Sequence, residues 1–166
     1  MAKGGGGNGG QGTPATVLLS AQRVAHTLHP YDVPPDSPGY GALVAGALGV
    51  PPEALFKTLV TEVDGALTVA VVPVTGELDL KALAAAAGGK RAVLADRAAA
   101  ERSTGYVRGG ISPLGQRRGL PTVVDSSSLA LDVMYVSAGR RGLQVSLAPA
   151  DLIRLTAAST GRISTG

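Results

Sequence analysis

The residues best suited to chemistry gather in one glycine-rich run, from Arg102 to Pro121. The run RSTGYVRGGISPLGQRRGLP holds five glycines, two prolines and four arginines, which excludes a regular helix along its length. Because glycine has no Cβ, the segment Gly109, Gly110, Ile111, Ser112, Pro113 can direct main-chain N–H groups at an oxygen, as oxyanion and phosphate cradles do. The flanking arginines favour an anionic partner. A solvated surface loop without a ligand is the alternative that glycine content leaves open.

A single lysine interrupts an apolar segment that is predicted to be a strand. Lys57 stands in LFKTLV, between residues that favour burial. Its side chain either reaches solvent from an edge strand or lines a pocket, where the ammonium would meet a phosphate or a hydroxyl.

Metal chemistry finds little support in the sequence. His26 and His29 are spaced in a way that invites metal ligation, but the chain has no other histidine and no cysteine. The ligand count therefore falls short of a zinc site, and we expect neither a metal nor a cofactor.

A protein nucleophile is also poorly supported. Ser103, Ser112 and Ser137 stand in no recognisable motif that pairs a nucleophile with a histidine base. The carboxylates are scattered, and Asp125 and Asp132 are interpreted as cap and turn residues rather than as a paired acid and base.

Three basic doublets could contact a nucleic-acid backbone. They are Lys90 and Arg91, Arg117 and Arg118, and Arg140 and Arg141. Each doublet alone is most often a solvated surface, whereas a stripe of doublets in loops would follow the phosphates of an RNA strand.

Composition limits the classes that remain. The 166 residues are 45% hydrophobic and 3% aromatic, so the core must be aliphatic and an RNA platform of stacked aromatic rings is not expected. A net charge of +3 is compatible with a phosphate-bearing ligand without requiring one. No long apolar run and no charged leader ahead of a hydrophobic stretch is present, so we expect a cytoplasmic protein that makes no membrane contact.

The elements that must position these residues follow from local signals. Thr13 and Pro14 open a helix whose apolar face is predicted to include Val17, Ala21, Val24 and Leu28. Further helices are expected at 39–48, after Asp79 and at 151–155, and Asp64 with Gly65 predicts a tight hairpin turn between strands 56–63 and 67–74. Short strands are predicted at 92–94, 122–124, 133–136 and 143–147. These elements favour a single compact mixed α/β domain over residues 13–158, between a flexible glycine-rich tail at 1–12 and a frayed tail at 159–166.

Five segments, in order and spacing, resemble the bacterial YbaK/EbsC family of free-standing aminoacyl-tRNA deacylases. They are HPYDVP, LFKTLV, VAVVPVTGELDLKAL, the run from Arg102 to Asp125, and YVSAGRRGL, and the resemblance spans roughly Thr13 to Leu155. The wider superfamily includes the editing insertion of prolyl-tRNA synthetases. The STGY and GGISPLGQ segments are most similar to the branch that clears Cys-tRNA(Pro).

The resemblance implies a mixed, barrel-like β-sheet surrounded by helices, with a pocket for the aminoacyl end of tRNA. The family lysine falls on Lys57 and the glycine loop on Gly109 to Pro113, with Tyr31 and the segment from Ser137 to Gly139 at the pocket wall. Relatives commonly carry an acidic residue where this chain has Gln144.

The implied reaction uses the thiol of the substrate to attack its own ester, so that the enzyme supplies orientation and oxyanion stabilisation. The implied partners are aminoacyl-tRNA, in particular tRNA(Pro), and prolyl-tRNA synthetase. A deacylase for Ala, Ser or Thr and a non-catalytic module that binds tRNA ends are the alternatives.

Overall fold

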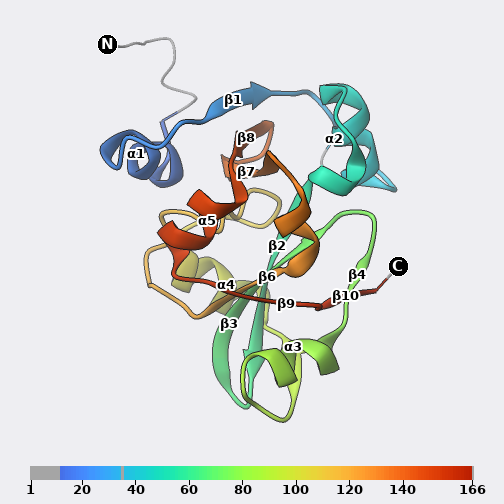
Figure 1. Cartoon of the computed structure of the whole chain (residues 1–166), viewed down its shortest axis with the longest axis vertical. Coiled ribbons are helices and arrows are strands. Elements are labelled where there is room, and N and C mark those ends of the chain that lie inside the picture. The colour runs from blue at the N-terminus through green and yellow to red at the C-terminus, as the bar shows by residue number, and fades with distance from the viewer. Residues whose placement is uncertain (1–11, 35, 166) are drawn as a thin grey trace.

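The strands that carry the candidate residues belong to two facing sheets. The computed structural model (Figure 1) describes residues 12–34 and 36–165. Its helices are α1 (Pro14–Ala21), α2 (Tyr40–Leu48), α3 (Leu80–Ala86), α4 (Arg97–Thr104) and α5 (Pro149–Thr156), with 3-10 turns η2 (Pro52–Ala54) and η3 (Ser126–Ala130). Its strands are β1 (Thr27–Pro30), β2 (Phe56–Val63), β3 (Ala66–Pro73), β4 (Glu77–Leu78), β5 (Ala92–Leu94), β6 (Thr122–Asp125), β7 (Met134–Arg140), β8 (Leu143–Leu147), β9 (Ser159–Gly161) and β10 (Ser164–Thr165).

The larger sheet has the order β5-β2-β3-β6-β9 and mixes antiparallel and parallel pairs. A three-stranded sheet, β1-β8-β7, lies toward the other end of the molecule (Figure 1), and β10 pairs with β4. The mixed α/β class is therefore confirmed. The described strands do not close into a barrel, because they divide among three sheets.

The predicted hairpin is confirmed and joins β2 to β3 in the larger sheet. Asp64 and Gly65 have φ of 50° and 85°, the left-handed pair that a two-residue turn between twisted strands requires. The Asp64 carboxylate also accepts the N–H groups of Lys90 and Arg91, at 3.0 and 2.9 Å, and so ties β5 to this turn.

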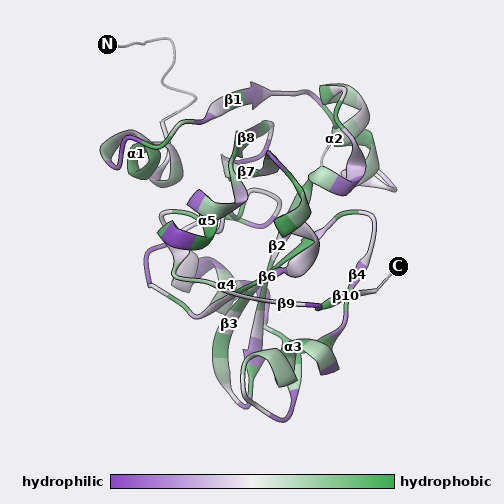
Figure 2. Ribbon diagram, in the orientation of Figure 1, coloured by the Kyte–Doolittle hydropathy of each residue, from purple (hydrophilic) through white to green (hydrophobic). Residues whose placement is uncertain are grey.

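Both faces of β3 are buried, which explains its unbroken apolar sequence. One face joins a core with β7, β8, α1 and α5, where Val69, Val71 and Met134 are fully buried. The other face packs against α3 and Ile163. Figure 2 shows α5 with hydrophobic and hydrophilic residues on different parts of its surface, and its Leu152 is fully buried in the first core.

The capping signals at several helices are confirmed. Thr13 and Thr16 form a capping box at the start of α1, Asp79 caps α3 through the Ala82 N–H, and α2 ends at Gly49 with φ of 69°.

The predicted apolar face of the first helix is wrong. The helix ends at Ala21, and Arg23 follows with φ of 56°, so the chain turns and Leu28 enters β1 beside β8. The buried side of α1 consists of Ala15, Thr16 and Leu19, and Val17 is 64% exposed. The run from Arg102 was expected to lack helix, but its first three residues complete α4, which Asp96 caps.

The expected frayed tail is an ordered part of the sheet. β9 extends the larger sheet beside β6, and Ile163 is fully buried. The physical reason is the buried carboxylate of Asp125, whose Oδ1 accepts the N–H groups of Ile163 and Ser164 at 2.9 and 3.0 Å. Of the predicted glycine-rich tail, residues 1–11 lie outside the described residues, as does Pro35. In the described part of the chain, no helix has the length and apolar character needed to cross a bilayer.

We predict that Asp125→Ala lowers the free energy of unfolding by about 2 kcal/mol, because three backbone N–H groups, including that of Ser127, lose their acceptor. Asp125→Asn should lose less, since its amide oxygen can still accept from Ile163 and Ser164. Chemical denaturation measures both, with Asp132→Ala at an exposed position as the control. Equal stability of Asp125→Ala and Asp132→Ala would contradict the role of Asp125.

Candidate active site

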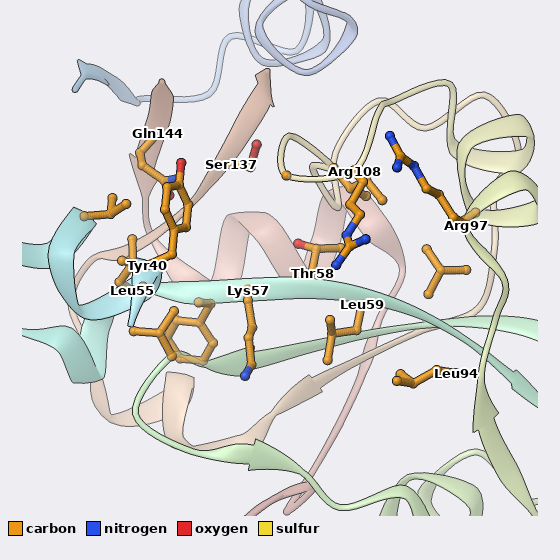
Figure 3. A pocket seen from close by; sticks show the side chains of 18 of the residues that line it. Tyr40, Leu55, Lys57, Thr58, Leu59, Leu94, Arg97, Arg108, Ser137 and Gln144 are labelled. Atoms are coloured by element: carbon orange, nitrogen blue, oxygen red, sulfur yellow. The ribbon is translucent and has the colours of Figure 1, made fainter. Parts of the chain in front are cut away.

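A cavity of about 770 Å³ opens between α2, β2, α4 and the loop at 108–111 (Figure 3). Six of the residues singled out from the sequence line it: Tyr31, Lys57, Gly109, Ile111, Ser137 and Gln144. These residues come from five separate parts of the chain, so the fold assembles most of the predicted site in one place.

The glycine loop offers backbone donors, but not from every predicted position. Gly110 N–H donates to Val107 O at 2.9 Å and is therefore occupied within a turn. The N–H groups of Gly109 and Ile111, which both line the cavity, make no hydrogen bond to another described residue. Among the residues of this loop that line the cavity, the free donors are thus on either side of Gly110.

Gly110 is needed for the position of the loop. A Cβ at Gly110 would lie 2.8 Å from the backbone of Arg140 and Arg141, so the loop rests directly on the hairpin between β7 and β8. Gly109 has φ of 88°, and a Cβ there would lie 2.6 Å from Arg141 Nε. A side chain at either position would displace the N–H donors.

Two side chains fix the loop at Arg108. Glu101 Oε2 accepts the Arg108 N–H at 2.9 Å, and Arg141 Nε donates to Arg108 O at 3.0 Å. The Arg108 N–H, followed by the Arg97 side chain at 3.1 Å, holds the pKa of Glu101 below its usual range. Glu101 therefore remains an ionised acceptor at neutral pH.

The remaining loop residues are structural. Ser112 is fully buried, and its Oγ accepts the Leu114 N–H at 3.2 Å. Pro113 is also buried, and neither residue lines the cavity. Gly139 lies outside the lining as well, because it packs against Tyr106 and Thr13 and donates its N–H to Ser137 Oγ at 3.1 Å.

Lys57 lies on β2 with its side chain one-third exposed, and Nζ is 3.9 Å from Glu77 Oε2. In Figure 3 its side chain leaves the strand on the opposite side from Thr58 and Arg108, as strand alternation requires. The ammonium therefore lies apart from the loop donors, at a different part of the cavity lining.

At the end of the cavity next to α2, the polar side chains are those of Tyr31, Tyr40 and Gln144. The hydroxyls of Tyr31 and Tyr40 are 2.9 Å apart, and burial, with the hydrogen bond to Tyr31, raises the pKa of Tyr40. Figure 3 shows Tyr40 and Gln144 at the same end of the cavity, and Gln144 is 8% exposed. Gln144 Oε1 is buried and has no hydrogen-bond partner in the described structure.

Sequence reasoning missed several lining residues: Tyr40, Thr58, Arg97, Glu101 and Arg108. Arg97 and Glu101 are four residues apart on α4, a signal that would have been visible had that helix been predicted.

The basic doublets do not share one location. Lys90 and Arg91 lie between α3 and β5, at the end of the molecule away from the hairpin of β7 and β8 that carries Arg140 and Arg141 (Figure 1). Arg117 and Arg118 are exposed, and their N–H groups donate to Thr104 O and Ser103 O. None of the six residues lines the cavity, although Arg141 holds its loop.

The histidines serve local contacts. His26 Nδ1 is 2.7 Å from Val24 O, and His29 Nε2 is 2.8 Å from Ser146 Oγ. Burial lowers the pKa of His29, and neither His29 nor Ser146 lines the cavity. Among residues 12–34 and 36–165, no three potential ligands gather at a metal site.

The arrangement suits the binding of an ester more than attack by a protein group. Two free N–H groups can stabilise a developing oxyanion, and Gln144 can accept a hydrogen bond from a bound donor. Ser137 is the serine of the lining, and its Oγ lies against the Gly139 N–H rather than a histidine.

The chain is similar to proteins of a known family. Residues 41–155 match the family model for the aminoacyl-tRNA editing domain. A protein of Enterococcus faecalis, named "Putative Cys-tRNA(Pro)/Cys-tRNA(Cys) deacylase EbsC", is 42% identical over 125 residues, which are 74% of this chain and 75% of the relative.

Solved structures share the fold over most of its length. The hypothetical protein APE2540 superposes with a TM-score of 0.81 at 25% identity, covering 92% of this chain and 100% of that one. A structure described as "a putative trans-editing enzyme for prolyl tRNA synthetase" gives a TM-score of 0.79 at 20% identity, covering 93% of this chain and 99% of that one. The resemblance found in the sequence is confirmed, and this chain belongs to the aminoacyl-tRNA editing domain family.

Proposed function

We propose that this protein is a trans-editing deacylase that removes cysteine from mischarged tRNA(Pro). The observation that carries the proposal is the cavity itself, whose lining combines Gly109 and Ile111, both with unpaired N–H groups, with Ser137 and Gln144. The name of the Enterococcus faecalis relative supports the choice of Cys-tRNA(Pro), with Cys-tRNA(Cys) as a second substrate.

In the proposed reaction, the thiol sulfur of the cysteinyl group attacks its own ester carbonyl. A carbon–sulfur bond forms, the bond to the ribose oxygen breaks, and the thiol proton passes to that oxygen. The product is a cyclic thioester, which water then opens to free cysteine. The role of the protein is to orient the thiol and to stabilise the oxyanion through the loop donors.

The biological need follows from the limits of recognition. Cysteine is about the size of proline, so a synthetase that selects its amino acid by shape cannot strongly reject cysteine. A second site must therefore remove cysteine from the mischarged tRNA. The proposal therefore implies prolyl-tRNA synthetase as the protein partner and the cytoplasm as the place of action.

The decisive assay offers purified protein Cys-tRNA(Pro), Ala-tRNA(Pro) and Pro-tRNA(Pro) side by side. Selective loss of the cysteinyl ester supports the proposal. Cleavage of Ala-tRNA(Pro) instead would indicate another amino-acid specificity, and binding of tRNA without cleavage would indicate a non-catalytic module.

We predict that Lys57→Ala strongly lowers the deacylation rate, because it removes a cation that lines the substrate cavity, and leaves the thermal midpoint nearly unchanged. The only ion pair of Lys57 within the described chain is with Glu77, whose side chain is 87% exposed, and such pairs stabilise by about 0–1 kcal/mol. Glu77→Ala is the matched control, because it removes the same ion pair and leaves the ammonium. If both variants lose activity equally, Lys57 acts through the pair and makes no contact of its own with the substrate.

We predict that Ser-tRNA(Pro) is cleaved far more slowly than Cys-tRNA(Pro). A thiol of pKa ~8.5 supplies much more nucleophile near neutral pH than an alcohol does. Rates for the two esters under single-turnover conditions give the comparison. Comparable rates, or complete inactivation by Ser137→Ala, would point to a protein nucleophile or an activated water.

We predict that Gly110→Val lowers the deacylation rate by about 10²-fold, the usual effect of removing one oxyanion donor. The substitution forces the loop off the hairpin. Gly119→Val is the control, since a Cβ there meets no atom within 4 Å. A rate for Gly110→Val equal to that of Gly119→Val would rule out the loop as the source of the donors.

A further inference from the structure

The end of the cavity near β5 and α4 carries a group of charged side chains that no step of the reaction uses. Arg97, Glu101 and Arg108 line this end, and Figure 3 shows Arg97 and Arg108 on the side away from Tyr40 and Gln144. Two cations and one carboxylate give this end a positive balance.

The two arginines are not neutralised equally. Arg97 Nε pairs with Glu101 Oε2 at 3.1 Å, and the same oxygen accepts the Arg108 N–H. This pairing uses one nitrogen of Arg97, whose side chain is 61% exposed. The Arg108 guanidinium has no hydrogen bond or ion pair within residues 12–34 and 36–165. Its donors are therefore available to an anion.

A buried hydroxyl of the cavity lining also lacks a partner. Thr58 Oγ1 is buried without a hydrogen-bond partner among the described residues, and Figure 3 shows Thr58 on the same side of β2 as Arg108. A buried polar atom without a partner is unfavourable until one is supplied.

Leu59 and Leu94 also line the cavity, but Figure 3 shows Leu59 on the side of β2 that carries Lys57, opposite Thr58 and Arg108. The charged part of this end is therefore formed by the arginines. A guanidinium presents a planar fork of N–H donors that matches a phosphate group, which an RNA 3′ end supplies.

We propose that Arg97 and Arg108 bind the phosphodiester on the 5′ side of the aminoacylated terminal nucleotide. The substrate then lies along the cavity, with its aminoacyl group toward Tyr40 and Gln144 and its ester beside Gly109 and Ile111. The assignment rests on the proposed function, which supplies the RNA 3′ end as the ligand.

Binding tests the site without any cleavage. Adenosine 5′-monophosphate and adenosine differ only in the phosphate, and NMR titration gives the dissociation constant of each. We expect the wild-type protein to bind the monophosphate at least tenfold more tightly. Arg108→Gln and Arg97→Gln should each reduce this ratio at least threefold, and the double variant should bring it close to one.

Lys81→Gln is the matched control, since Lys81 is an exposed cation on α3 outside the cavity lining. A ratio near one in the wild type, a double variant that keeps the wild-type ratio, or an equal loss in Lys81→Gln would each overturn the assignment. Unchanged thermal midpoints exclude misfolding of the variants.

Cleavage separates this assignment from the proposed function. The 3′-cysteinyl esters of adenosine and of adenosine 5′-monophosphate are offered to each protein, and the ratio of their kcat/KM values is expected to fall in the arginine variants as the binding ratio does. If the wild type cleaves neither ester and yet prefers the monophosphate in the titration, the phosphate site stands and the deacylase proposal fails.

Discussion

The cavity depends on how one residue, Arg108, is held. Its N–H is accepted by Glu101 of α4, and its carbonyl oxygen is bound by Arg141 from the hairpin of β7 and β8. Both hydrogen bonds involve a charged side chain, and such bonds are stronger than neutral ones. A helix and a hairpin that are far apart in the sequence are thus joined through a single peptide segment. The donors at Gly109 and Ile111 follow directly from it along the chain.

The hydrogen bond from the Arg108 N–H to Glu101 persists at neutral pH. The pKa of Glu101 is held below its usual range, first by the Arg108 N–H and then by Arg97. A lowered carboxyl pKa adds stability that is fully present above the unfolded-state value and is lost as the pH falls through the folded-state value. Protonation of Glu101 therefore requires a pH below the range in which an ordinary glutamate titrates.

Local chemistry predicted most of the elements. The capping pair Thr13 and Pro14, the turn at Asp64 and Gly65, and the cap at Asp79 each act within a few residues, so sequence reasoning found them. The order of elements and six lining residues followed from the same signals and from the family resemblance.

Features that depend on distant partners were not predictable in this way. Asp125 was interpreted as a cap, which it is for η3, but its bonds to Ile163 and Ser164 also order the C-terminal strands. Arg141 was assigned to RNA from its doublet, although its side chain binds the Arg108 carbonyl. Pattern alone does not distinguish a cation that meets a phosphate from one that meets a carbonyl oxygen, because both are acceptors at a surface.

On the proposed function, selectivity must come from geometry and from the substrate, since the lining pairs no serine with a histidine. Gln144 is consistent with selectivity that comes from geometry. Its buried Oε1 lacks a partner, and an unsatisfied buried acceptor costs about 1–3 kcal/mol, which a bound N–H or ammonium group recovers. A neutral amide oxygen accepts from an ammonium without the attraction that a carboxylate would add. Gln144 therefore favours one orientation of the aminoacyl group and adds less to affinity than an acidic residue would, which suits a protein that must release its tRNA after one correction.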